Sequence, residues 1–406
     1  METSYAFTDP RAQTIWAKKL FDYAMPNIML SALMGNNSNA FIHVDKELLK
    51  KTGATIVFKA RQRLENVGVG DDGDTTGNEG QIKRRNMSLV VHERANSTVS
   101  AGKMSEKLTD SKFREDSKME LGDWVTECIE DDTATAIFGL YNENSSSANI
   151  QTINESYPTS SRIYYGGQSA AGTLANSGAS FTTDALLTAD TTANNLMGTH
   201  LLSAIRRRAV AAVPRFKGGK VPDLSKQTDA DIRDGVSGPL VGVFFTVLLH
   251  PFQIKAIRDE TGTSGWAVMT SEAQKRGNLN PIFTGAAFLW DGMICWEYDR
   301  VPTRTGAGGT TLAEGFLLNA GRTATTDACA NGRSVARAVL MGAQACCFGW
   351  GMLPEWGEDY VDVNKGKVKV DLIYGVHRTV FNEHGTSTPG QDESLYCIDT
   401  EIQIDA

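Results

Sequence analysis

Long apolar runs are missing from this sequence. The longest is Leu240–Leu249, which is far shorter than the roughly 20 residues that a helix needs to cross a bilayer. The N-terminus, from Met1 to Tyr5, has no basic segment followed by an apolar one, so it lacks the pattern of a secretory signal. Together these absences predict that the protein has no membrane partner.

Positive charge is also scarce. The 40 Lys and Arg residues against 48 Asp and Glu residues give a net charge of -8 and an isoelectric point near 5.4. This balance argues against a dedicated nucleic-acid binder with a basic face, but it leaves room for local basic contacts. Hydrophobic residues make up 41% and charged residues 22%, which is ordinary for a soluble globular protein of one or two domains.

Patterns that would indicate a metal, a cofactor or a catalytic centre are absent as well. The six cysteines have the spacing of neither a disulfide framework nor a zinc site, and a reducing compartment is expected. Cys346 and Cys347 are adjacent in an apolar run, so we interpret both as small buried hydrophobic residues. The six histidines are isolated, and there is no H-E-x-x-H or G-x-S-x-G motif. We therefore expect no cofactor and no enzymatic activity.

The most informative segment that is present is residues 55–95. Two β-rich arms, 55–64 and 82–91, face each other across a polar tip with glycines at 68, 70, 73, 77 and 80. Arms of this length would reach roughly 33 Å at about 3.3 Å per residue. Because an isolated hairpin is marginally stable in water, this one needs a surface to lie on. A neighbouring subunit is the expected surface.

The charges of this hairpin are separated by sign. The arms carry the basic residues Lys59, Arg61, Arg63, Lys83, Arg84 and Arg85, and the tip carries the acidic residues Asp71, Asp72 and Asp74. We interpret these residues as intersubunit pairing groups.

The tip also matches two binding motifs formally. Gly68–Gly73 reads G-x-G-x-x-G, but no amphipathic helix follows and the aspartates would repel a pyrophosphate. With Glu79, these aspartates could also supply oxygen ligands to calcium, although the EF-hand spacing is absent. A solvated acidic tip, or one that contacts a basic neighbour, remains the alternative.

The rest of the chain predicts an α+β fold. Leu121, Val125 and Ile129 belong to an i, i+3, i+4 pattern that predicts one long helix over 107–141. Residues 142–193 are rich in Ser, Thr, Asn, Ala and Gly and are expected to form loops and an insertion. Further on, we expect a helix over 194–213, a strand over 241–249, a helix starting at His250-Pro251 and strands at 294–297, 367–381 and near 398–404. The segment 339–349 is expected to close the α/β domain with small residues that allow close packing.

The densest basic cluster is Arg206-Arg207-Arg208, followed by Arg215, Lys217 and Lys220. Phosphates of a nucleic-acid backbone are one candidate partner. The alternatives are a solvated helix face or salt bridges to another subunit.

The order of these parts resembles the major capsid proteins of tailed bacteriophages. The similarity lies in an N-terminal arm, a long charged hairpin, a long helix, an α/β domain and a final β segment, and in three local stretches: Leu248–Ile257, Asn280–Gly285 and Ala338–Ala345. The opening Ala12–Trp16 is similar to podophages that package a large virion RNA polymerase.

The resemblance implies a specific domain organisation. Residues 1–50 would be the N-terminal arm, 51–105 the extended loop and 106–193 the peripheral domain with its spine helix and an insertion. Residues 194–350 would be the axial domain, and 351–406 a β return to the peripheral domain.

The resemblance also implies a function. Hexamers and pentamers of the chain would form an icosahedral shell around double-stranded DNA, as part of the virion and assembled in the host cytoplasm. The arm begins almost at Met1, so a separate scaffolding protein is implied, with portal and decoration proteins as further partners. Because the chain is acidic, we expect DNA to be held mainly by confinement, with Arg206, Arg207 and Arg208 as the candidate DNA-facing residues.

Two other functions remain open on the sequence alone. The first is a nanocompartment shell subunit of the same fold, which would enclose cargo proteins. The second is a soluble α/β enzyme, for which no motif is found.

Overall fold

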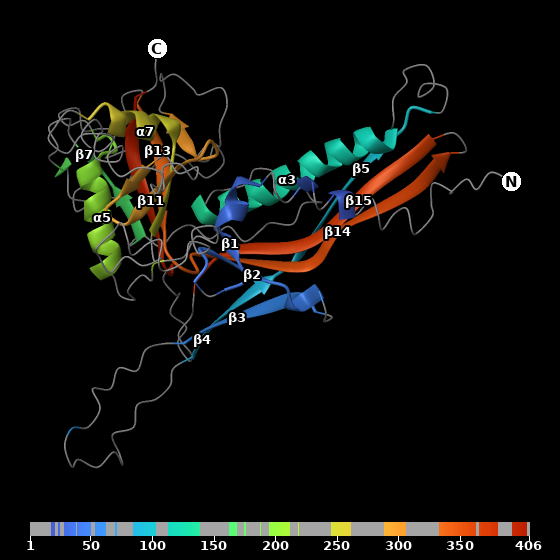
Figure 1. Ribbon diagram of the computed structural model, residues 1–406, viewed down its shortest axis with the longest axis horizontal. Coiled ribbons are helices and arrows are strands. Elements are labelled where there is room, and N and C mark those ends of the chain that lie inside the picture. Colours follow the sequence, from blue (N-terminus) through green and yellow to red (C-terminus); the bar gives the residue numbers. More distant parts are fainter. Residues whose placement is uncertain are drawn as a thin grey trace, which may run out of the picture.

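The computed structural model describes the parts of the chain that form two β-sheets, the helices packed on them and a two-stranded hairpin (Figure 1). The described residues are 18–20, 23–24, 28–37, 39–49, 53–61, 70, 84–102, 113–138, 162–168, 174–175, 187, 195–211, 218, 245–260, 288–305, 333–362, 365–380 and 392–403.

The first sheet is built around one long hairpin. Its spatial order is β1 (Met34–Gly35), β2 (Ile42–Asp45), β14 (Cys346–Asp362), β15 (Lys365–Arg378) and β5 (His92–Val99). β14 and β15 have 17 and 14 residues and pair in antiparallel fashion, with register shifts near Met352 and Tyr360. Two short 3-10 helices, η1 (Met29–Leu33) and η2 (Glu47–Leu49), flank β1 and β2.

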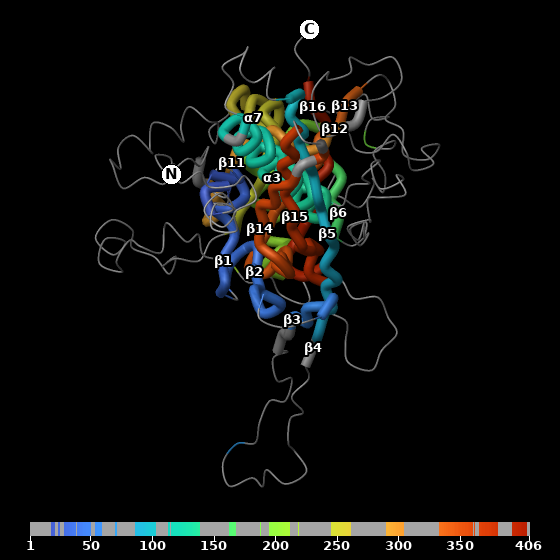
Figure 2. The backbone as a smooth tube through the Cα atoms, turned by 90° about the vertical axis from the view of Figure 1, so that its right-hand side faces the viewer, coloured from blue at the N-terminus to red at the C-terminus, as the bar shows by residue number. Residues whose placement is uncertain are grey.

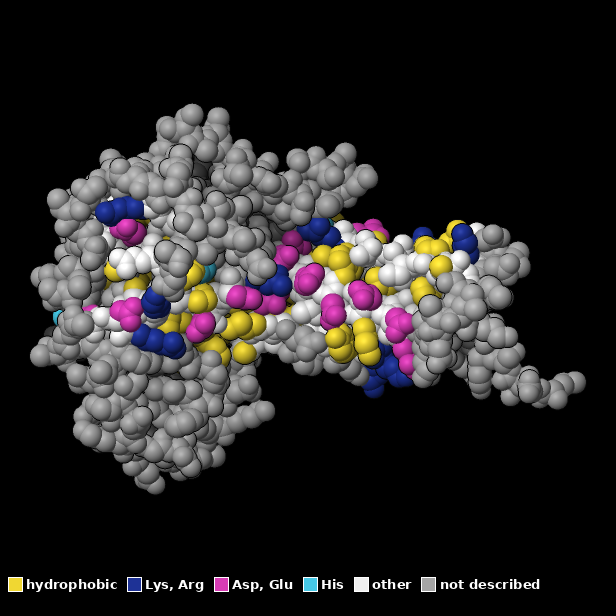
Figure 3. Space-filling view, turned by 90° about the horizontal axis from the view of Figure 1, so that it is seen from above, with side chains coloured by type: hydrophobic (Ala, Val, Ile, Leu, Met, Phe, Trp, Pro, Cys, Tyr) yellow, Lys and Arg dark blue, Asp and Glu magenta, His cyan; other side chains and the backbone are white. Residues whose placement is uncertain are grey.

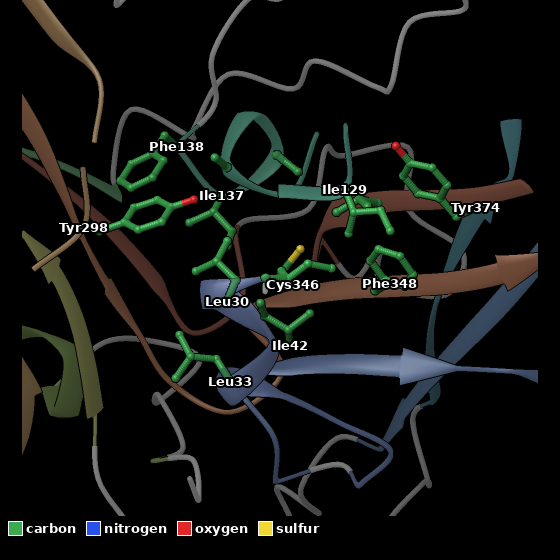
Figure 4. Packing of buried hydrophobic residues seen from close by; sticks show 14 of the residues in the cluster. Leu30, Leu33, Ile42, Ile129, Ile137, Phe138, Tyr298, Cys346, Phe348 and Tyr374 are labelled. Atoms are coloured by element: carbon green, nitrogen blue, oxygen red, sulfur yellow. The ribbon is translucent and has the colours of Figure 1, made fainter. Parts of the chain in front are cut away.

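A single long helix, α3 (Phe113–Phe138), covers one face of this sheet. Leu121, Val125 and Ile129 are buried against the sheet, as their spacing predicts. The remaining residues of the predicted range 107–141 lie outside the described residues. Figure 4 shows Ile129 near Phe348 and Tyr374 of the sheet. The phenyl ring of Phe348 stacks on the ring of Tyr374, with 5.6 Å between ring centroids.

The second sheet has seven strands. Its order is β10 (Phe288–Trp290), β11 (Met293–Glu297), β9 (Phe245–Leu249), β13 (Ser334–Met341), β16 (Leu395–Ile402) and β6 (Ile163–Tyr165), with β12 (Thr303–Thr305) paired to β13. Helices α5 (Thr199–Ala211) and α7 (Pro251–Arg258) pack their apolar sides against one face of it. A short pair, β7 (Gly167–Gln168) and β8 (Leu174–Ala175), lies beside α5.

The two sheets share one hydrophobic core. Met341 of the second sheet, Phe348 of the first and Ile137 of α3 belong to the same cluster of buried residues. The chain passes between the sheets through a short turn at 342–345, where Gln344 has a positive φ of 58°. The segment 339–349, which was expected to close the α/β domain, therefore runs from β13 through this turn into β14 of the first sheet.

Two expected segment assignments also need correction. β16 pairs with β13 along its whole length, so this part of 351–406 belongs to the second sheet rather than returning to the first. β6 lies in the predicted loop-rich insertion, yet it pairs with β16 and buries Tyr164. Both strands pair with partners that are far away in the sequence, which a local pattern does not reveal.

The predicted N-terminal arm is partly built into the subunit. Leu20, Ile28 and Leu30 are buried in the shared core, and β2 pairs with β14. The apolar residues of this segment therefore pack on their own chain. Residues 1–17 lie outside the described residues.

Candidate functional site

The base of the extended hairpin consists of β3 (Thr55–Arg61) and β4 (Arg84–Val90), which pair in antiparallel register from Thr55↔Val90 to Arg61↔Arg84. One face is apolar and buried, as the alternation of Met87 and Leu89 predicts. This face forms a small core with the first sheet, made of Ile56, Phe58, Met87, Leu89 and Cys347. The expectation that the hairpin lies on a neighbouring subunit is therefore wrong for its base, which is anchored on its own chain.

Two glycines in the sheet make this close contact possible. Gly349 and Gly375 are cross-strand partners in β14 and β15. A Cβ atom at Gly349 would lie 2.4 Å from Cδ1 of Ile56, and one at Gly375 would lie 2.4 Å from the carbonyl oxygen of Val90. Because no side chain intervenes, the hairpin base rests directly on the backbone of the sheet.

The hairpin base and α3 lie on opposite faces of the first sheet. Successive side chains of a strand point to opposite faces, and Phe348 and Trp350, on either side of Gly349, belong to the core beneath α3. Figures 1 and 2 agree, since β14 and β15 lie between α3 and the β3–β4 pair. The first sheet therefore separates the hairpin base from α3 of the same chain.

The basic residues predicted as pairing groups meet at the end of this base. In the β3–β4 ladder Arg61 is opposite Arg84, Ala60 is opposite Arg85 and Lys59 is opposite Asn86. Like charges directly opposite each other destabilise a strand pair. The register of this ladder therefore brings Lys59, Arg61, Arg84 and Arg85 to the same end of the hairpin base.

The remaining residues of this prediction lie outside the described residues. They are Arg63, Asp71, Asp72, Asp74 and Lys83, with most of the glycine-containing tip. The proposed calcium ligands are among them, so the calcium alternative stays open.

The exposed side of α3 is acidic. Beyond the first turn, Glu120, Asp123 and Glu127 are exposed, and with Asp116 they follow a spacing of i, i+4, i+7 and i+11. At 3.6 residues per turn these positions fall within an arc of about 60° and extend for about 16 Å along the helix. Figure 3, seen from above, shows acidic side chains along this part of the molecule. The spacing of these acidic residues is visible in the sequence and complements the apolar pattern that predicts the helix.

The basic cluster on α5 does not act as one uniform patch. Nη1 of Arg206 is 2.6 Å from Oδ1 of Asp291 in an ion pair. The guanidinium of Arg208 lies over the ring of Tyr164, 4.6 Å from its centroid. Arg207 is exposed on the helix between them. Two of the three arginines thus already contact their own chain, and Arg215, Lys217 and Lys220 lie outside the described residues.

A buried ion pair joins the second sheet to the end of α3. Arg337 and Asp399 are cross-strand partners, and both side chains are fully buried. Nε and Nη2 of Arg337 donate to the two carboxylate oxygens of Asp399 at 2.7 and 2.6 Å. Nη1 also points to the carbonyl oxygen of Phe138, the last residue of α3, at 3.4 Å. A cation at the C-terminus of a helix complements its dipole.

A second polar network holds α3 on the first sheet. Nη2 of Arg94 donates to both carboxylate oxygens of Asp132 at 2.9 and 3.1 Å, and the hydroxyl of Tyr374 donates to the same carboxylate. Burial raises the pKa of Asp132, while Arg94 and Tyr374 act in the opposite direction. The network connects β5, α3 and β15.

Helix α7 begins at the predicted position, His250-Pro251, and its first turn is closed by a capping box. Nδ1 of His250 accepts from the N–H of Phe252 at 3.2 Å, and Oε1 of Gln253 accepts from the N–H of His250 at 3.0 Å. Nε2 of Gln253 also donates to the hydroxyl of Thr400 in β16 at 2.7 Å. Burial lowers the pKa of His250 to about 4, which keeps the ring neutral and able to accept.

The cysteines behave as hydrophobic residues. Cys346 and Cys347 are buried in the cores, as predicted, and burial raises the pKa of Cys347 to about 12. Within the described ranges, no group of three or more His, Cys, Asp or Glu side chains could hold a metal ion. None of the helices that the structure describes is long and apolar enough to cross a membrane.

The comparison with known families is decisive. A sequence model of a family described as phage capsid protein matches residues 4–404. The chain belongs to the phage capsid protein family. This confirms the resemblance inferred from the order of the parts. Among proteins with curated functions, none matches the sequence significantly.

Solved structures of phage capsids share the fold. The capsid of Ralstonia phage GP4 matches with a TM-score of 0.68 and 20% identity over 100% of both chains. The cyanophage Pam1 capsid matches with a TM-score of 0.62 and 16% identity over 93% of this chain and 92% of that one. The capsid of Helicobacter pylori bacteriophage KHP30 matches with a TM-score of 0.58 and 12% identity over 91% of this chain and 90% of that one. This phage capsid protein therefore has the fold of tailed-phage capsid subunits, and its function is structural.

Proposed function

We propose that this capsid protein forms the hexamers and pentamers of an icosahedral shell that encloses double-stranded DNA in the virion. The family match over residues 4–404 carries this proposal, and the agreement in fold with three phage capsids supports it. The nanocompartment alternative is not favoured, because the matching family consists of phage capsid proteins. In this proposal the chain acts by assembly and catalyses no reaction.

The extended hairpin is the proposed intersubunit element. Its base is anchored on the face of the first sheet that lies away from α3. Lys59, Arg61, Arg63, Lys83, Arg84 and Arg85, with the tip residues Asp71, Asp72 and Asp74, are the proposed pairing groups. Shell contacts repeat many times, so individually weak contacts suffice.

The other partners follow from this role. A separate scaffolding protein would direct assembly in the host cytoplasm, a portal would occupy one vertex, and decoration proteins could bind outside. DNA would be held mainly by confinement. Arg207 is the most available of the three candidate DNA-facing arginines, because Arg206 pairs with Asp291 and Arg208 stacks on Tyr164.

Coexpression tests the proposal directly. The chain is produced with and without a phage scaffolding protein, and the particles are imaged by electron microscopy. We expect closed shells or capsomers, whereas a stable monomer under all conditions would contradict the proposal.

Deleting residues 68–80 should impair assembly while the subunit still folds. In a matched control, a Gly/Ser linker of equal length replaces the same residues, which separates the role of length from that of charge.

DNA retention tests the confinement model. Replacing Arg207 with Gln removes the most available positive charge of the cluster, and Lys255→Gln on α7 serves as the charge-matched control. We expect packaged particles of both variants to retain DNA equally at moderate salt. A steep loss that is specific to Arg207→Gln would instead indicate a phosphate contact.

A further inference from the structure

The outer edge of the first sheet, formed by β5, has no partner strand among the described residues. β5 is the last strand in the order of this sheet, beside β15 (Figure 2). It has eight residues, whereas the strands at the other ends of the two large sheets, β1, β10 and β6, have two or three. Proteins usually blunt a long edge with proline, lysine or a bulge, because it is a template for a further strand. β5 contains neither proline nor lysine, and its pairing with β15 has no register shift.

The backbone groups of this edge can be assigned residue by residue. The N–H of Ser100 donates to the carbonyl oxygen of Gly366 at 2.8 Å, which marks a hydrogen-bonded pair at the end of the β5–β15 ladder. Hydrogen-bonded and non-hydrogen-bonded pairs alternate along antiparallel strands. The even-numbered residues of β5 therefore bond to β15, and the odd-numbered residues direct their N–H and C=O groups away from it. These open residues are Glu93, Ala95, Ser97 and Val99, and all four are exposed.

The open edge ends at defined points. The odd-numbered residue before it, Val91, already donates its N–H to the carbonyl oxygen of Ala54 at 3.1 Å. After the edge the extended backbone is interrupted at Gly102, whose φ is 126°. The four open residues therefore form a closed set, and this set is symmetric about Asn96.

This symmetry suits a second copy of the same strand. In an antiparallel pair centred on Asn96, the first open residue of one copy faces the last of the other, and the second faces the third. Every open N–H and C=O then meets an open partner. A pair centred on Ala95 would instead place Val99 against Val91, whose N–H is already bonded to Ala54. A shift in the other direction would place one open residue beyond the end of the strand. The open positions therefore select one register.

The side chains fit this register. Ala95 and Ser97, the two small side chains near the centre, would face each other across the new ladder. Glu93 would face Val99 of the second copy, and Val99 lies opposite Lys367 in its own sheet. Glu93 of one copy and Lys367 of the other would then be two strands apart, about 10 Å at about 4.8 Å per strand, and their opposite charges attract.

Helix α3 leaves this edge accessible. Arg94 and Thr98 both bond to residues of α3, so the even-numbered side chains of β5 lie on the side of the helix. Asn96 lies on this side between them and is exposed. Its Oδ1 accepts from the N–H of Ser97 at 2.8 Å. This local bond occupies one open donor in the single subunit, and it would be exchanged for a ladder bond when a second strand pairs.

We propose that the β5 edges of two copies of this chain pair in antiparallel fashion across a local two-fold axis at Asn96. The first sheets of the two copies then form one continuous sheet. A two-fold interface uses the same surface on both subunits, and an icosahedral shell contains such axes. This inference rests on the proposed shell function and assigns one of its subunit contacts. Because backbone hydrogen bonds form most of the contact, it persists as salt is raised.

Disulfide trapping tests the pairing. The two copies of residue 96 would form a non-hydrogen-bonded pair with Cα atoms about 4.5 Å apart, which is within disulfide range. Asn96→Cys chains are assembled with the scaffolding protein, and the shells are oxidised and run on a non-reducing gel. We expect most chains to run as a dimer that reduction removes.

The register gives matched controls. Two copies of Glu93→Cys would lie about 20 Å apart, so shells of this variant alone should give no dimer. Shells mixed from Glu93→Cys and Val99→Cys chains should give one, because these residues would face each other. The mixture is also a second readout if Asn96→Cys chains fail to assemble. Wild-type shells show whether the native cysteines, of which those described are buried or half-buried, contribute any dimer.

A proline tests the backbone bonds themselves. Ser97→Pro removes an N–H that faces away from β15, so the subunit should still fold and melt close to the wild-type temperature. We expect the yield of closed shells, counted by electron microscopy, to fall at least about tenfold, because the contact repeats throughout the shell. Ser97→Ala keeps the N–H and should assemble normally. If Ser97→Pro misfolds, the disulfide test decides alone.

Several outcomes would overturn the pairing. Oxidised shells of Asn96→Cys without a dimer would do so, as would a dimer of Glu93→Cys that is equally abundant. Normal shell yield from a folded Ser97→Pro chain would also contradict it. If the wild-type chain forms no shells with scaffolding protein, the proposed function fails and the pairing fails with it. If the wild type forms shells and the Asn96→Cys link is missing, only the pairing fails.

Discussion

Removing one partner of the Arg337–Asp399 pair should destabilise the subunit more than any exposed charge change. Both side chains are fully buried, and two hydrogen bonds of 2.7 and 2.6 Å join them. Replacing Arg337 with Met leaves a carboxylate in the core without its counter-charge. Breaking such a buried pair costs about 3–5 kcal/mol, a large share of the typical 5–15 kcal/mol stability of a domain.

The double substitution gives the matched control. Replacing Arg337 with Met and Asp399 with Val removes both charges and leaves apolar side chains that suit a central strand. Exchanging a buried ion pair for apolar residues is often neutral or stabilising. We therefore expect the free energy of unfolding of the double variant to lie within about 1–2 kcal/mol of the wild-type value. A small loss is expected because the long contact from Arg337 to the carbonyl of Phe138 is also removed.

Urea unfolding of the unassembled subunit, followed by tryptophan fluorescence, measures these free energies. The two single variants and the double variant complete a mutant cycle, which isolates the coupling between the two side chains. We expect a coupling of at least about 2 kcal/mol. A loss below about 1 kcal/mol in the Arg337→Met variant would refute the reasoning, as would a double variant as unstable as the sum of the single ones.

Three further predictions concern the hairpin base, the helix cap and the polar network. Gly349→Ala should destabilise the hairpin base by about 1–3 kcal/mol, because the new Cβ would overlap Cδ1 of Ile56. Adding Ile56→Val removes Cδ1 and should restore part of the lost stability. Thermal melting of both variants measures this. His250 has a pKa lowered to about 4, so its contribution to stability is complete above about pH 6.5 and is lost as the pH falls towards 4. His250→Asn keeps a capping side chain and should make the free energy of unfolding vary less with pH over this range, by about 2–3 kcal/mol. Urea unfolding at several pH values measures this, and an unchanged pH profile would contradict it. Tyr374→Phe should cost about 1.5–3 kcal/mol because Asp132 loses a buried donor, and a loss within error of zero would show that Arg94 alone satisfies the carboxylate.

Local patterns in the sequence predicted the elements that depend on local chemistry. The apolar spacing of Leu121, Val125 and Ile129 indicated α3, and the run before His250-Pro251 indicated β9 and α7. Alternation at Met87 and Leu89 identified the buried face of the hairpin. In each case the periodicity of one element was enough, because the same residues form the element and pack its buried side.

The remaining features depend on residues far apart in the sequence. Arg337 and Asp399 are 62 positions apart, and Arg94 reaches Asp132 across 38, so no motif predicts either pair. The anchoring of the hairpin on Gly349 and Gly375 likewise depends on how the strands pack, because a glycine in a strand does not reveal which segment covers it. For the candidate site, the sequence identified the two arms of the hairpin and its buried face, but not the sheet on which its base is anchored.

The position of β16 within the second sheet has a consequence for synthesis of the chain. This strand lies between β13 and β6, so the interior of the sheet is complete only after residue 402 has been made. Until then the edge of β13 that pairs with β16 has no partner strand, because sheets that depend on distant pairing form late. A nascent chain therefore cannot present a finished subunit surface to its neighbours. The topology itself delays the moment at which a new chain becomes competent to join a growing assembly.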